Sequence, residues 1–188
     1  MGITLLQILM VVWAVAETSL MIRTRARRGT ARQGARGSAW IVWTVIAFSI
    51  GGALWAQASP APRFPVQQAV CVWTGLAVML SGMVVRLAAI RQLGRYFSVD
   101  VAIQREHRVI RSGLYAHLRH PSYTGMLLAF LGLGIALGNW LSLALAALPT
   151  TAVVLYRIGV EEQALAHEFG DEYQRYREQT SRLVPGIY

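Results

Sequence analysis

Apolar residues along this chain fall into long blocks that are separated by short polar segments. Five blocks are almost wholly apolar, and they cover residues 3–22, 39–56, 66–89, 123–137 and 140–156. About 20 consecutive apolar residues suffice for a helix to cross the hydrocarbon layer of a bilayer. The pattern therefore predicts an all-α integral membrane protein with about five transmembrane helices. The last two blocks are shorter than the others, so they either cross fully or form a re-entrant pair.

Small and turn-forming residues predict how these helices connect and pack. Only Gly138 and Asn139 separate the last two apolar blocks, which indicates a tight helical hairpin. Along the fourth block, glycine recurs at Gly125, Gly132 and Gly134. Small residues at helical spacing let two helices approach closely in lipid. We therefore expect these glycines to serve helix packing.

The charge pattern gives the predicted helices an orientation. Only 14% of the residues are charged, against about 25% in a typical soluble domain. All 18 basic residues are arginines, and all but Arg63 fall in segments that five crossings place on one side of the membrane. The positive-inside rule puts that side in the cytoplasm, with the amino terminus outside, and we expect the cell inner membrane. The basic balance then reflects topology and contact with anionic membrane lipids.

Nucleic acid is not an expected partner. The densest arginine segment, residues 23–28, contains no aromatic residue on which a base could stack. A metal site is not expected either, because the only cysteine, Cys71, lies within the third apolar block without a cluster of potential ligands around it. Glu17 is an acid inside the first block, and we expect it to pair with Arg23 or Arg86.

The whole chain, residues 1–188, is predicted to form a single membrane domain. Residues 1–65 form a two-span scaffold, whereas residues 66–188 contain most of the polar chemistry. Within that core, residues 161–177 carry apolar side chains at spacings of three and four, which predicts an amphipathic helix interrupted at Gly170. The apolar tail at residues 183–188 is expected to fold back against the domain.

A first polar cluster, RHPSY at residues 119–123, lies where a basic loop meets the fourth apolar block. Pro121 suits the first turn of a helix, where no backbone donor is needed. The free donors and the dipole of that turn favour an anion, and Arg119 and His120 add side-chain donors. The cluster predicts a carboxylate or phosphate site. The simpler alternative is that Arg119 contacts lipid phosphate and His120 only caps the helix.

A second cluster, Arg157, Glu161 and Glu162, lies at the end of the fifth apolar block. Arg157 and Glu161 are four residues apart and share a helix face, whereas Glu162 points about 100° away. The simple interpretation is a local ion pair beside a solvated acid. The hairpin, however, returns both clusters to the same side of the membrane. Acids on one helix and anion-binding donors on the other would together hold a zwitterion by both ends.

The two clusters carry a resemblance to a known family. Residues 119–125, RHPSYTG, resemble the RHPxYxG element of the isoprenylcysteine carboxyl methyltransferase family. Residues 161–176 resemble its EExxL…FGxxYxxY element, and the resemblance extends over roughly residues 75–188. It implies methylation that depends on S-adenosylmethionine, in a cofactor pocket that the carboxyl-terminal half forms and that opens to the cytoplasm. It also implies a lipophilic, prenylcysteine-like substrate whose carboxylate accepts the methyl group.

The resemblance also implies a role for each site residue. Glu162 would bind the amino group of the cofactor, and His120 with the amino end of the fourth helix its carboxylate. The rings of Tyr115 and Tyr123 would pack on adenosine or the sulfonium. The catalytic residues would be Arg157, which orients the substrate carboxylate, and Glu161, which holds Arg157. The complete set expected at the cofactor is Gly113, Leu114, Tyr115, Arg119, His120, Pro121, Tyr123 and Glu162.

Three other functions fit parts of the same pattern. One is an N-methyltransferase for phospholipids or amines, in which a carboxylate would replace Arg157 as the key group. Another is a sterol-type membrane reductase that uses NADPH, with arginines between residues 86 and 119 on the phosphate. The paired acids fit a cationic cofactor better than NADPH. The third is a membrane scaffold or lipid-binding protein without catalytic activity.

Overall fold

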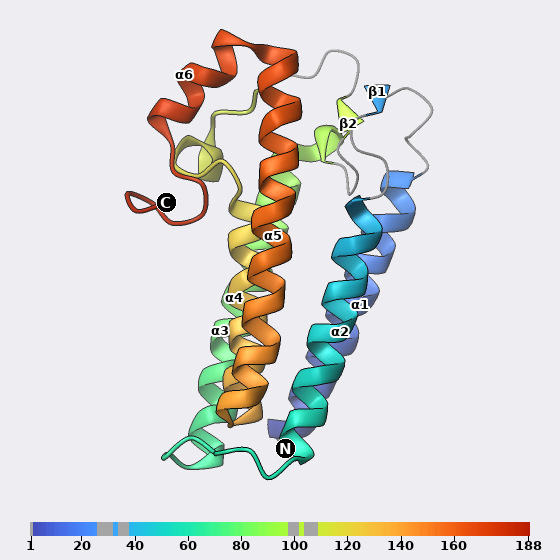
Figure 1. Ribbon diagram of the computed structural model, residues 1–188, viewed down its shortest axis with the longest axis vertical. Helices are drawn as coiled ribbons and strands as arrows, with labels where there is room; N and C mark the ends of the chain where they lie inside the picture. Colours follow the sequence, from blue (N-terminus) through green and yellow to red (C-terminus); the bar gives the residue numbers. More distant parts are fainter. Residues whose placement is uncertain (1, 26–31, 34–37, 98–101, 104–108) are drawn as a thin grey trace.

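Six helices account for most of the chain in the computed structural model, which describes residues 2–25, 32–33, 38–97, 102–103 and 109–188. The 3-10 turns η2 (Gly94–Tyr96) and η3 (Gly113–Ala116) lie between the third and fourth helices, and the strands β1 (Arg32–Gln33) and β2 (Ala102–Ile103) pair antiparallel. The predicted all-α class is confirmed (Figure 1). The helices are α1 (Gly2–Arg25), α2 (Ser38–Ala58), α3 (Gln68–Leu93), α4 (Pro121–Leu137), α5 (Trp140–Phe169) and α6 (Asp171–Gln179).

Each of the five predicted apolar blocks forms one of the first five helices. By length and composition, α2, α3 and α5 are long and apolar enough to cross a membrane. The apolar parts of α1, Thr4–Leu20, and of α4, Pro121–Leu137, are shorter. A crossing by all five helices therefore stays a prediction.

The outward faces of these helices are apolar, as contact with lipid requires. Large apolar side chains point away from the bundle on every one of them, for example Val15, Trp55, Val84, Leu131 and Leu148. An apolar surface of this extent is rare on a monomeric soluble protein.

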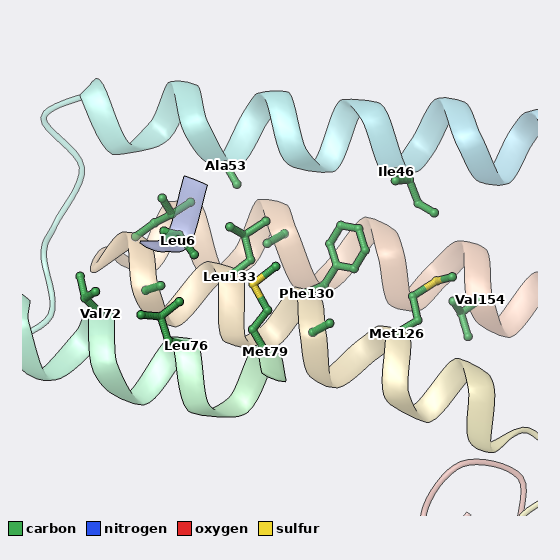
Figure 2. Close-up of a cluster of buried hydrophobic side chains, with 14 of the residues drawn as sticks. Leu6, Ile46, Ala53, Val72, Leu76, Met79, Met126, Phe130, Leu133 and Val154 are labelled. Carbon is green, nitrogen blue, oxygen red and sulfur yellow. The ribbon is translucent and has the colours of Figure 1, made fainter. Parts of the chain in front are cut away.

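The helices pack in a defined order around an apolar core. Helix α3 runs along α4, α2 runs along α5, and α1 contacts α3. Side chains from all five meet in the interior, among them Leu6, Ala53, Met79, Leu133 and Val154 (Figure 2). The amino terminus lies at one end of the bundle, whereas the tail and α6 lie at the other (Figure 1).

Glycine brings α3 and α4 to backbone contact, as the sequence predicts. A Cβ atom at Gly132 would lie 2.4 Å from the Met79 nitrogen and 2.6 Å from the Gly75 oxygen. About two turns nearer the site, a Cβ at Gly125 would lie 2.5 Å from the Gly82 oxygen. No side chain larger than hydrogen fits at either crossing, so this contact fixes where the amino end of α4 lies.

The predicted hairpin between α4 and α5 is confirmed. Gly138 ends α4 with φ 77°, in the left-handed region that favours glycine. Asn139 then caps α5, because its Oδ1 accepts a hydrogen bond from the Ser142 nitrogen at 2.7 Å. The Ser142 hydroxyl donates to the Ala53 carbonyl at 2.7 Å and so ties the hairpin to α2.

Helix α5 extends further than the sequence pattern predicts. The fifth block was expected to end at residue 156, with a separate amphipathic helix from residue 161. Instead α5 is continuous to Phe169, and Gly159, which lies between the apolar block and the amphipathic stretch, keeps helical backbone. The predicted interruption at Gly170 is confirmed, since Gly170 has φ 50° and α6 begins directly after it. The continuous helix holds both acids rigidly in line with the hairpin.

Candidate active site

The two polar clusters meet where the first turn of α4 lies against α5. The Tyr123 hydroxyl donates a hydrogen bond to Glu161 Oε1 at 2.6 Å. Arg157 Nε donates to the same oxygen at 3.1 Å, across one turn of α5. His120 Nδ1 lies 3.7 Å from Glu161 Oε2. The expected proximity of the two clusters and the expected Arg157–Glu161 pair are both confirmed.

Glu162 faces a different set of partners, as its position on the helix predicts. Arg119 Nε lies 2.9 Å from its Oε1, and an Arg182 guanidinium nitrogen lies 2.9 Å from its Oε2. His120 Nε2 is 3.4 Å from Oε1 without forming a hydrogen bond. The carboxylate is 5% exposed. One buried acid is therefore shared by two arginines from segments far apart in the chain.

The chain after α6 closes over this end of α4. The Arg119 nitrogen donates to the Ser181 carbonyl at 2.8 Å, and the His120 nitrogen donates to the Arg182 carbonyl at 3.1 Å. The Thr124 hydroxyl donates to the Leu183 carbonyl at 2.8 Å, and Leu183 joins the apolar core. The prediction that the apolar tail folds back is confirmed for Leu183, whereas Val184, Ile187 and Tyr188 are exposed. The tail also brings Arg182 to the site.

Tyr115 lies deeper than Tyr123 and has different contacts. Its hydroxyl donates to the Ala89 carbonyl at 3.4 Å, and its own carbonyl accepts from the Tyr176 hydroxyl at 2.8 Å. Just before it, the Leu114 nitrogen donates to Gln92 Oε1 at 2.9 Å. Burial raises the pKa of the Tyr115 hydroxyl and raises the pKa of Tyr176 to about 12. Residues 113–115 are thus anchored to α3 and α6, and Tyr123 is the tyrosine that binds Glu161.

Sequence reasoning missed two parts of the site. Arg182 counted only toward topology, because it follows a helix break and shares no spacing with the acids. The other is the hydroxyl of Tyr173, which is buried and has no hydrogen-bond partner among the described residues. Burial, and next the charge of Glu162, raise the pKa of this hydroxyl.

A sequence comparison connects this geometry to a family. Residues 73–167 match the family described as the isoprenylcysteine carboxyl methyltransferase (ICMT) family. The chain belongs to this family. The matching part holds most of α3, all of α4, nearly all of α5 and both polar clusters. It does not include α1, α2, α6 or the tail with Arg182.

Members of the family are similar over part of their length. Protein-S-isoprenylcysteine O-methyltransferase of Schizosaccharomyces pombe is 36% identical over 116 residues, which are 61% of this chain and 49% of that protein. Protein-S-isoprenylcysteine O-methyltransferase B of Arabidopsis thaliana is 34% identical over 115 residues, 60% of this chain and 58% of that protein. The chain thus spans about half to three fifths of the length of these relatives.

A solved structure supports the same relationship in three dimensions. It is that of the eukaryotic intramembrane Ras methyltransferase ICMT, which shares 27% sequence identity with this chain and superposes with a TM-score of 0.54. The likeness covers 78% of this chain and 51% of the other. Together with the apolar helices, it makes this chain a multi-pass membrane protein of the ICMT fold.

Within the described residues, no group of three or more His, Cys, Asp and Glu side chains could hold a metal ion. The polar groups of the site are instead arginines, tyrosines, one histidine and two acids. Such groups suit an organic ligand that carries both a cation and a carboxylate.

Proposed function

We propose that this chain transfers a methyl group from S-adenosylmethionine to the carboxylate of a lipophilic, prenylcysteine-like substrate at the membrane. The observation that carries the proposal is the separation of the two adjacent acids. Glu161 is bound by Arg157 and Tyr123, whereas Glu162 is bound by Arg119 and Arg182. Membership of the ICMT family and the names of the similar proteins support the same activity.

The chemistry asks little covalent work of the protein. When bound, S-adenosylmethionine supplies a methyl group on a sulfonium: a C–O bond forms as the C–S bond breaks, its electron pair passes to sulfur, and S-adenosylhomocysteine is left. The carboxylate needs no proton to be removed. The residues therefore have to bind, to align two groups and to exclude water.

Arg157 is the residue that we propose binds the substrate carboxylate. Its side chain is 2% exposed, so its charge acts in a region from which water is largely excluded. Glu161 accepts from Nε and thereby fixes the plane of the guanidinium, and the Tyr123 hydroxyl fixes Glu161 in turn. A planar guanidinium held in this way can pair with a carboxylate through two parallel hydrogen bonds.

The second acid fits the amino group of the cofactor. His120 Nε2 lies 3.4 Å from Glu162 Oε1, and the Tyr173 hydroxyl lies within the electrostatic influence of Glu162. Both atoms are buried and lack hydrogen-bond partners among the described residues. We propose that the ammonium group joins Glu162 in place of Arg182, whose side chain is 30% exposed and can turn away. Arg182 and His120 then face the cofactor carboxylate.

The remaining expected residues form the wall of this pocket. Arg119 holds the tail, Pro121 starts α4, and residues 113–115 set the floor against α3. The ring of Tyr123 stays the candidate for a contact with the sulfonium. The pocket is proposed to open to the cytoplasm, with the tail as its cover.

The proposed arrangement in the membrane follows the arginines. The amino terminus lies outside, the carboxyl terminus lies in the cytoplasm, and the arginine-rich face contacts anionic lipid of the cell inner membrane. Residues 1–65 act as scaffold and residues 66–188 as the methyltransferase core of a single domain. A cysteine placed at Gly186, near the exposed tail tip, should react with an impermeant maleimide only after the membrane is opened.

Ligand-induced stabilisation of the detergent-purified protein tests the proposal. A ligand that binds only the folded state raises the apparent melting temperature, by an amount that grows with the logarithm of its concentration over its dissociation constant. S-adenosylhomocysteine at saturating concentration should raise the melting temperature, and NADPH at the same concentration should not. Stabilisation by NADPH alone would identify a reductase and overturn the proposal. Stabilisation by neither would favour a scaffold.

A further inference from the structure

A further buried ion pair lies between α1 and α3. Arg86 of α3 donates from Nε and Nη2 to the two carboxylate oxygens of Glu17 of α1, the latter at 2.7 Å. Trp13 Nε1 donates to the same carboxylate at 3.0 Å. Glu17 is 8% exposed and Arg86 is 7% exposed. The expectation that Glu17 pairs with Arg23 or Arg86 is thus confirmed for Arg86.

The pair does more than join α1 to α3. The third nitrogen of the guanidinium, Arg86 Nη1, donates to the Ser122 hydroxyl at 2.9 Å and to the Ser122 carbonyl at 3.2 Å. Ser122 is the second residue of α4, between Pro121 and Tyr123. The side chain of Arg86 therefore connects the carboxylate of α1 directly to the turn that carries the candidate site.

Burial makes this connection depend on Glu17. An arginine cannot release its proton inside a protein, so a buried guanidinium needs an anionic partner. Without Glu17 the charge of Arg86 would be uncompensated, and the side chain would move toward water or another anion. Its two hydrogen bonds to Ser122 would then be lost, and the first turn of α4 would lose its hold on that side.

We propose that Glu17 is a positioning residue for the candidate site: it holds Arg86, which fixes Ser122 and with it the first turn of α4 against the acids of α5. Glu17 lies outside the part of the chain that matches the ICMT family, residues 73–167. A scaffold helix thus contributes one residue to the geometry of the core. An effect of Glu17 on catalysis rests on the proposed function. Its effect on the position of the first turn of α4 does not.

Hydrogen exchange of the detergent-purified protein tests the geometry without any assay of activity. The Tyr123 and Thr124 amides both donate to the His120 carbonyl, so they report on the first turn of α4. In Glu17→Gln their exchange should be at least about threefold faster than in the unmodified chain. The control Leu6→Ala weakens the same helix at its other, apolar end and should leave both rates unchanged. Equal acceleration in the two variants, or none in either, would overturn the proposal.

A double-mutant cycle tests that Glu17 acts through Arg86. Glu17→Gln in an Arg86→Gln background should add little to the exchange rates, because the connection is already broken. Additive effects would contradict the proposed route. If Glu17→Gln does not fold, Ser122→Ala removes one acceptor of Arg86 and leaves the ion pair in place. Ser122→Ala should accelerate exchange at the Tyr123 and Thr124 amides. Unchanged exchange rates at these amides would contradict the proposal.

Kinetics then separate positioning from stability. Glu17→Gln should raise KM for S-adenosylmethionine and lower kcat, with kcat/KM reduced at least about tenfold. Leu6→Ala should lower only the fraction of active protein, with KM unchanged. If the unmodified chain neither binds S-adenosylhomocysteine nor transfers methyl groups, the proposed function fails, while the exchange experiment still decides the role of Glu17.

Discussion

The α3–α4 contact and the polar end of the bundle are held together in opposite ways. Along α3 and α4, backbone touches backbone at Gly75, Gly82, Gly125 and Gly132, and the closest atoms at each of these crossings are uncharged backbone atoms. At the polar end, long side chains bridge α4, α5 and the tail through arginines and acids. The first region requires residues without side chains, whereas the second requires side chains of matching opposite charge.

The difference predicts that the two regions fail differently. Adding a single carbon at the glycine contact should destabilise the protein without changing a functional group. At the polar end, a substitution that removes one charge and keeps the size of the side chain should change ligand binding or catalysis. The helix bundle should stay folded.

The largest expected effect is that of Gly132→Ala. The added Cβ would lie 2.4 Å from the Met79 nitrogen, so α3 and α4 would have to separate. We expect the free energy of unfolding in detergent to fall by about 3 kcal/mol, which corresponds to a fall of about 10 °C in melting temperature. Gly51→Ala on α2 is the matched control, because a Cβ at Gly51 meets nothing within 4 Å. It should be neutral or stabilising by up to about 1 kcal/mol, and an equal loss in both variants would contradict the packing argument.

Next in size is the effect of Arg157→Ala on catalysis. Loss of the guanidinium that we propose orients the substrate carboxylate should lower kcat/KM by about a hundredfold or more. Stabilisation by S-adenosylhomocysteine should persist, because Glu162 has its own partners. Arg175→Ala, which removes an exposed arginine of α6, should leave turnover unchanged. Activity retained in Arg157→Ala would remove this residue from the mechanism.

Neutralising Glu161 and neutralising Glu162 should have different effects. Glu162→Gln should weaken binding of S-adenosylhomocysteine at least about tenfold, because a neutral amide cannot form an ion pair with an ammonium group. Glu161→Gln should lower kcat with little change in that affinity, because its partner is Arg157. Titration calorimetry and initial rates measure the two quantities. Identical effects of the two variants would refute the division of roles.

The smallest expected effect is on stability at high pH. An unfolded tyrosine ionises near pH 10, whereas burial raises the pKa of Tyr176 to about 12 and also raises that of Tyr173. Below pH 10 both states hold the proton, and between pH 10 and 12 only the folded state does. Stability must therefore fall as the pH rises through that window. Tyr173→Phe loses no hydrogen bond to the described residues, so it should match the parent at pH 7 and melt higher at pH 11. A steeper fall than that of the parent would contradict burial as the cause.

The sequence predicts the helices and their connections well, because these depend on local pattern. Apolar blocks give the helices, Gly138 and Asn139 give the hairpin, and Gly170 gives the break before α6. The predicted end of α5 was wrong because the apolar pattern changes to an amphipathic one while the helix continues through Gly159. A change of environment along a helix was thus mistaken for a change of structure.

Tertiary polar contacts were only partly predictable. The match of Arg157 with Glu161 follows from helical spacing, and the family resemblance points to both clusters. The contact of Arg182 with Glu162 and that of Arg86 with Ser122 depend on how distant segments return to α4. No spacing in the sequence encodes either contact. Both lie where charge, and not shape, determines the structure.

Transfer of labelled methyl groups tests the central claim most directly. The detergent-purified chain would be given S-adenosylmethionine with a tritiated methyl group and an S-prenylated N-acetylcysteine, in parallel with the same compound blocked as its methyl ester. The account predicts label on the free acid only, released as methanol by mild base, as an ester requires. Label that resists base, or equal labelling of the blocked compound, would show that the substrate carboxylate is not the acceptor. No transfer to the free acid would contradict the account outright.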